Sequence, residues 1–67
     1  MNTTLKPHQE RVVTEKNELD DKRKKLTAFI GSDVWRGLAE IEQSRLNRQL
    51  GAMTLYSNIL KERIASF

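Results

Sequence analysis

The sequence contains no cysteine, one histidine (His8), one proline (Pro7) and three glycines among its 67 residues. No disulfide can form, and a single histidine without cysteine does not provide the ligands of a structural zinc site. A monomer of this length buries only about 60% of the surface that its unfolded chain exposes. Because neither a disulfide nor a bound metal can stabilise the fold, we expect the chain to self-associate. The absence of cysteine also fits a reducing environment.

Long apolar runs are missing as well. No stretch approaches the roughly 20 apolar residues that cross a bilayer, and the first residues lack the apolar core of a signal peptide. We therefore expect a soluble, cytosolic protein that does not contact a membrane.

The charge balance is mildly basic. Twelve lysines and arginines against nine acidic residues give a net charge of +3, and the pI is about 9.6. This excess favours partners that carry phosphate, but it is too small to predict nucleic-acid binding by itself.

Helix is predicted along nearly the whole chain, because proline, glycine and runs of β-branched residues are scarce. We expect residues 1–6 to form a flexible N-terminus and residues 7–67 to form one helical domain. The first helix is predicted to start at Pro7, which suits a first turn, and to run to about Ile30, with Gly31 as a left-handed C-cap. Its apolar residues recur every seven positions: Val12, Leu19 and Leu26.

A short helix is expected next, capped by Ser32 or Asp33 and running through Leu38, followed by a bend near Ala39 and a long helix to the C-terminus. The long helix carries a heptad-like stripe that only Ser57 interrupts. The members of this stripe are Leu46, Leu50, Met53, Leu60, Ile64 and Phe67. The predicted fold class is thus all-α, a helical hairpin with a short connecting helix.

A second apolar stripe widens the face of the long helix beyond what one partner helix can cover. It comprises Ile41, Leu55, Tyr56 and Ile59. This width predicts a contact with another subunit. Trp35 and Tyr56, the aromatic residues with polar handles, are both predicted to be core residues rather than ligand platforms.

Catalytic and cofactor motifs are lacking: there is no cysteine nucleophile, no Gly-rich phosphate loop, and neither an HExxH nor a GxSxG motif. The carboxylates of the first helix are spaced to form surface ion pairs with residues four positions later. The expected pairs are Glu18–Lys22, Asp20–Lys24 and Asp21–Lys25. We expect no enzyme activity and no cofactor.

Four consecutive cations, Lys22 to Lys25, lie in the second half of the first helix. Cations interact favourably with a helix C-terminus, which is a sufficient structural reason for them. The alternative is that one or two reach a subunit interface and bind a phosphate there. Further candidates for this role are Arg11, Arg45, Arg48 and Arg63. His8 lies at the start of the first helix, where it is either solvated or stacked on a base.

A set of spaced residues extends over almost the whole chain from Pro7 onward. Its first half comprises His8-Gln9-Glu10-Arg11-Val12-Val13, Glu15-Lys16, Glu18-Leu19-Asp20, Lys22, Lys25-Leu26 and Phe29-Ile30, and its second half Leu46, Gln49, Met53, Tyr56-Ser57, Leu60, Glu62-Arg63-Ile64 and Phe67. This set resembles a family of short phage proteins that includes the anti-CBASS sponges. CBASS is a bacterial defence that uses cyclic oligonucleotides as alarm signals.

The resemblance implies a compact hexamer of helical hairpins in the cytoplasm of an infected bacterial host. Such proteins hold cyclic dinucleotides between protomers and cyclic trinucleotides at separate sites around a three-fold axis. They sequester the signal without cutting it, so the defence effector stays inactive.

Carried over by position, the resemblance implies that His8 stacks on a base of the dinucleotide and that Lys25 binds its phosphate. Lys22 is the alternative phosphate ligand and Arg11 assists. For the trinucleotide, the resemblance implies Thr27 and Arg63. The sequence departs from the better-known sponges at His8, where they offer tyrosine, so weaker stacking is expected in the dinucleotide pocket.

Two other functions remain open from the sequence. One is a helical oligomeric adaptor that binds a host protein and no nucleotide. The other is a DNA-binding protein, which the interleaved acidic residues and the lack of a clear recognition helix disfavour. We therefore do not expect DNA as a partner.

Overall fold

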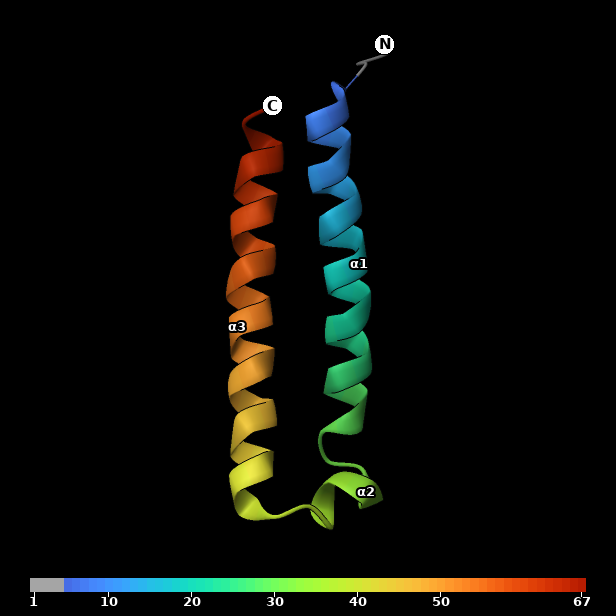
Figure 1. The fold of residues 1–67 in the computed structure, drawn as a ribbon, viewed down its shortest axis with the longest axis vertical. Helices are drawn as coiled ribbons and strands as arrows, with labels where there is room; N and C mark the ends of the chain where they lie inside the picture. The colour runs from blue at the N-terminus through green and yellow to red at the C-terminus, as the bar shows by residue number, and fades with distance from the viewer. Residues whose placement is uncertain (1–4) are drawn as a thin grey trace.

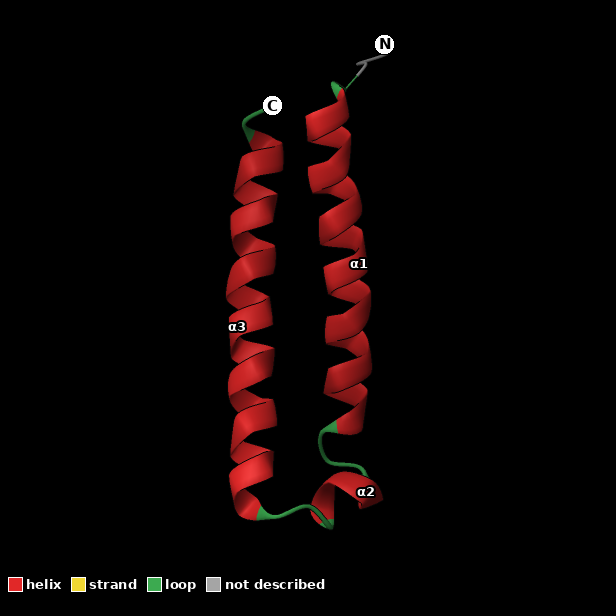
Figure 2. Ribbon diagram, in the orientation of Figure 1, coloured by secondary structure: helices red, strands yellow, loops and turns green. Residues whose placement is uncertain are grey.

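The computed structural model describes residues 5–67, which form two long antiparallel helices joined by a short one (Figures 1 and 2). The elements are α1 (Pro7–Phe29), α2 (Asp33–Arg36) and α3 (Glu40–Ala65). The start of α1 and the end of α3 lie at one end of the hairpin and α2 at the other (Figure 1). The predicted helical hairpin is confirmed. Of the predicted flexible N-terminus, residues 1–4 lie outside the described residues.

The ends of α1 follow the local sequence. Pro7 occupies the first turn, and the backbone N–H of Lys6 donates to Oε1 of Gln9 over 2.9 Å, which fixes the chain at the helix start. The helix ends at Phe29, one residue earlier than expected. Gly31 has a φ of 92°, which a residue with a side chain rarely adopts, so glycine allows the turn as predicted.

The connection between the long helices is tighter than expected. The hydroxyl of Ser32 accepts from the backbone N–H of Trp35 and caps α2. Because the helix ends at Arg36, Leu38 lies outside it, contrary to the prediction. The side chain of Gln43 donates to the carbonyl of Trp35 over 2.9 Å and ties the start of α3 to α2.

The seam between α1 and α3 contains a small core. Val12, Leu19 and Leu60 are buried, and the half-buried Met53 and Ile64 pack against them. Leu60 is fully covered. The predicted heptad positions thus form the contact between the helices, although Leu26, the third position of the α1 seam, is only half-buried.

The molecule is a rod of 50 × 16 × 16 Å. Because α1 covers only one side of α3, the second apolar stripe remains exposed in the single chain, with Ile41 56%, Leu55 62% and Ile59 45% accessible. Tyr56, predicted to be a core residue, is 42% exposed for the same reason, and Phe67 at the end of the seam is 44% exposed. Trp35, the other predicted core aromatic, is only half-buried.

Across residues 5–67, neither long helix contains a stretch apolar enough to span a bilayer.

Candidate functional site

A polar network crosses the seam between the two long helices. Ser57 of α3 is buried, with 3% of its surface exposed, and its hydroxyl donates to Oδ1 of Asp20 on α1 over 2.6 Å. The other carboxylate oxygen of Asp20 accepts from Lys16 at 2.6 Å, and Arg23 donates to Oδ1 at 2.9 Å. One carboxylate therefore links two cations of α1 to the opposite helix.

These contacts hold the pKa of Asp20 well below its ordinary value. The hydrogen bond from Lys16 contributes most, followed by that from Ser57, while partial burial opposes them and Arg23 adds a further lowering. All of these donors stabilise the ionised carboxylate. Asp20 is therefore charged at neutral pH and fixes the relative position of α1 and α3 at this point.

We expect acid to remove the contribution of Asp20 to stability. Because its folded-state pKa is lowered, this contribution is complete above the unfolded pKa of about 3.9 and declines as the pH falls further toward the lowered value. Asp20→Asn should therefore melt at a lower temperature than the wild type at neutral pH, and the difference should shrink between about pH 4 and pH 2. Circular-dichroism melts over this range, with the exposed Glu18→Gln as control, measure it. A constant difference between wild type and Asp20→Asn would contradict the assignment.

The four dinucleotide candidates lie along one side of α1 in two groups. His8 and Arg11 are one helical turn apart near its start, and Lys22 and Lys25 are one turn apart near its end. All four side chains are exposed. His8 and Lys25 are seventeen residues apart on one straight helix, which corresponds to about 25 Å. One chain therefore cannot bring both groups to the same small ligand.

The ion pairs differ from those predicted. Lys25 pairs with Asp21 as expected, at 3.1 Å, but both side chains are largely exposed, at 78% and 62%. Such an exposed pair contributes little to stability. In the part of the chain that the structure describes, neither Glu18–Lys22 nor Asp20–Lys24 forms an ion pair, so these two predictions are wrong. The carboxylate of Asp20 is engaged by Lys16, Arg23 and Ser57 instead.

The trinucleotide candidates lie toward opposite ends of the hairpin. The bond between Asp20 and Ser57 sets the register of the antiparallel helices. Thr27 is seven residues beyond it in one direction and Arg63 six residues beyond it in the other, which separates the two by about 20 Å along the rod. Both residues are exposed. A ligand that contacts both therefore requires Thr27 and Arg63 from different chains.

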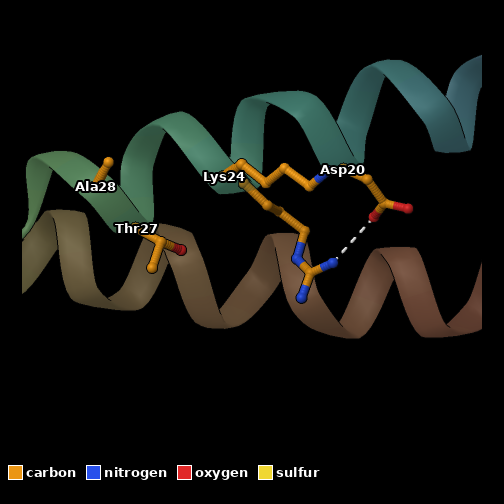
Figure 3. Close-up of a pocket in the computed structure, with 5 residues that line it drawn as sticks. Asp20, Lys24, Thr27 and Ala28 are labelled. Carbon is orange, nitrogen blue, oxygen red and sulfur yellow. Dashed lines mark hydrogen bonds and ion pairs between the residues drawn. The ribbon is translucent and has the colours of Figure 1, made fainter.

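A groove lies beside Thr27 on α1 (Figure 3). It has a volume of about 560 Å³ and is lined by Asp20, Arg23, Lys24, Thr27 and Ala28. Lys24 extends along α1 in the direction of Asp20 (Figure 3). No three histidine or acidic side chains among residues 5–67 are arranged to hold a metal ion.

Sequence reasoning missed the network around Asp20. It treated Asp20 as a surface partner of Lys24 and Ser57 as a gap in an apolar stripe. Ser57 itself was the signal for this network, because a serine buried in a helix seam needs a hydrogen-bond partner on the facing helix. Asp20, between Leu19 and the cationic run, is the residue that provides it.

Comparison with known proteins gives one family. No curated protein and no solved structure matches the chain. The model of a family described as Sequestin matches residues 6–66, which include all three helices. The chain therefore belongs to the Sequestin family, which makes it a binding, non-catalytic protein with a sequestering role.

Proposed function

We propose that the chain is a phage anti-defence sponge that sequesters cyclic dinucleotides and cyclic trinucleotides without cleaving them and so keeps the CBASS effector inactive. The family match over residues 6–66 carries this proposal, because it supplies a sequestering role that needs no catalytic centre. The identity of the ligands is inferred from the resemblance to anti-CBASS sponges. The protein would bind them in the cytoplasm of the infected bacterium.

The arrangement on α1 supports a dinucleotide site made by two chains. When a second α1 runs antiparallel along the first, His8 and Arg11 of one chain come beside Lys22 and Lys25 of the other. Two-fold symmetry then produces this combination twice. Each site joins a base-stacking side chain to cations that bind phosphate through charge-assisted hydrogen bonds.

The trinucleotide site requires several chains for the same geometric reason. Thr27 and Arg63 lie about 20 Å apart along one hairpin, so a three-fold assembly has to bring Thr27 of one chain to Arg63 of another. Three copies around an axis then match the three phosphates of a cyclic trinucleotide. This site is separate from the dinucleotide site, because Thr27 is not on the side of α1 that carries His8 and Lys25.

The exposed stripe of α3 supports the self-association that both sites need. Ile41, Leu55 and Ile59 are each about half exposed or more in the single chain, and Tyr56 borders them. Apolar side chains gathered in this way on a monomer mark a protein contact. A second copy of the chain is the occupant that we propose, in a homohexamer of hairpins.

The same stripe favours the second candidate, an adaptor that binds a host protein through α3 and takes no nucleotide. Both functions place a protein on Ile41, Leu55 and Ile59, so the stripe does not separate them. They differ in whether a small cyclic ligand binds the folded protein.

Thermal melting against a ligand panel tests the proposal. With cyclic di- and trinucleotides at 100 times the dissociation constant, mass action adds about 2.7 kcal/mol to the free energy of unfolding, which raises the melting temperature measurably. The matched linear dinucleotide should produce no comparable shift, and light scattering should give a multi-subunit mass. An oligomer whose melting temperature is unchanged by every cyclic ligand would contradict the sponge function and support the adaptor function.

A further inference from the structure

The apolar pattern of the seam does not define a single alignment of α1 and α3. On α1 the seam residues recur every seven positions, at Val12, Leu19 and Leu26. The stripe of α3 repeats with the same period, as Met53 and Leu60 show. When the two helices slide past each other by one heptad, about 10 Å, apolar side chains therefore lie opposite apolar side chains again.

Ser57 interrupts this repeat on α3. It occupies the position that Leu50 and Ile64 occupy one heptad before and one heptad after it. Among residues 5–67 it is the only buried polar side chain, with 3% of its surface exposed. Its hydroxyl donates to Oδ1 of Asp20 over 2.6 Å. The repeat of α3 thus contains one polar position, and that position has its partner on the facing helix.

Asp20 has one bond that depends on how the helices are aligned. Its donors Lys16 and Arg23 lie on α1 and move with it in any register. Among the described side chains, only Ser57 reaches it from α3, so only this bond is lost when α3 slides. Hydrogen bonds to a charged group are stronger than those between neutral groups. The loss therefore counts against every shifted register.

A shift by one heptad gives both polar residues poorer partners in either direction. In one direction Asp20 lies opposite Leu50. Ser57 then lies opposite Val13, whose side chain has no polar atom, so a buried hydroxyl is left unsatisfied. In the other direction Ser57 lies opposite Thr27, whose neutral hydroxyl is a weaker partner than a carboxylate. Only the observed register pairs the buried hydroxyl with the charged group.

We propose that the bond between Asp20 and Ser57 selects the register of the hairpin, because it excludes the alignments shifted by one heptad that the apolar seam alone tolerates. A single buried polar residue sets the register of coiled coils in the same way. This role goes beyond the sponge function and requires no ligand. It matters for assembly, since a shift by one heptad changes the separation of Thr27 and Arg63 along the rod by about 10 Å.

Replacement of both polar partners tests this role. Removal of one partner leaves the other unsatisfied, whereas an apolar pair in place of both is usually neutral or stabilising. Asp20→Leu combined with Ser57→Ala should therefore melt no lower than a few degrees below the wild type and yet populate a second register. The chain has no cysteine, so Asn17→Cys on α1 and Asn47→Cys on α3, both at exposed positions, can carry spin labels.

Double electron–electron resonance measures the distance between the two labels, with labelled chains diluted in unlabelled ones so that only pairs within one chain contribute. The wild type should give one distance. The apolar pair should add a second distance that differs by up to about 10 Å, the shift of one heptad. Asp21→Leu combined with Asn58→Ala makes a similar change at the neighbouring exposed positions and should keep the single distance.

The connection between the helices is the rival determinant of the register, through the bond from Gln43 to the carbonyl of Trp35. If the bond between Asp20 and Ser57 selects the register, Gln43→Ala should keep the single distance. A single wild-type distance in the apolar pair would overturn the proposal, and so would a melting temperature as low as that of Asp20→Asn. A second distance in Gln43→Ala but not in the apolar pair would assign the register to the connection.

Discussion

Leu60→Ala should unfold the protein or lower its melting temperature by roughly 10 °C or more. Leu60 is the one fully covered side chain in the described hairpin, and it packs in the cluster with Val12 and Leu19. Truncation of a buried leucine to alanine usually costs about 2–5 kcal/mol, through lost burial and the cavity left behind. With so small a core, other contacts cannot replace this loss. Circular-dichroism melting at a fixed chain concentration measures it.

Val34→Ala is the control for this change. Val34 is 66% exposed on α2 and belongs to neither long helix. The same kind of truncation should therefore shift the melting temperature by only a degree or two, since surface changes usually stay within about 0.5 kcal/mol. Equal effects of the two substitutions would mean that the seam between α1 and α3 is not the core of the folded protein.

Lys25→Ala should weaken the binding of cyclic dinucleotides at least tenfold and leave the fold unchanged. A charge-assisted hydrogen bond contributes about 1.5–3 kcal/mol, and 1.4 kcal/mol corresponds to a factor of ten in affinity. In the folded chain the change removes only the exposed pair with Asp21, which is worth little. Calorimetric titration with a cyclic dinucleotide measures the affinity, and light scattering follows the mass.

Two controls make this test specific. Lys61→Ala removes the same charge from another exposed position on α3 and should bind dinucleotides as the wild type does. Thr27→Ala and Arg63→Ala should weaken trinucleotides and spare dinucleotides. Full dinucleotide affinity in Lys25→Ala, with the assembly intact, would refute the assignment of Lys25. Lys22 would then be the candidate phosphate ligand.

The helices could be predicted from the sequence because their signals are local. Pro7 and Gly31 mark the ends of α1, and Ser32 caps α2 through a contact within three residues. The spacing of Val12, Leu19 and Leu60 in apolar stripes then predicts the hairpin, since each stripe needs a partner. The wrong details are at the helix ends, such as Leu38, where single hydrogen bonds decide the boundary.

The site could not be predicted to the same degree, because it depends on how the two helices are aligned. The four-residue spacing along α1 suggested that Asp20 pairs with Lys24. In the structure the carboxylate of Asp20 instead accepts a hydrogen bond from Ser57 of α3, in the seam between the helices. The separation of Thr27 from Arg63 also follows only from this register. Sequence periodicity places a residue on a face of its own helix and does not specify which residue of the other helix lies opposite.

Recovery of the ligand after capture tests the central claim, sequestration without cleavage, most directly. The protein is incubated with a cyclic trinucleotide or dinucleotide, separated from unbound ligand by filtration, and then denatured, and the released ligand is identified by mass spectrometry. The account predicts that the ligand co-purifies with a multi-subunit protein and returns with its mass unchanged. Linear products would contradict sequestration, and the absence of any retained ligand would contradict the sponge function.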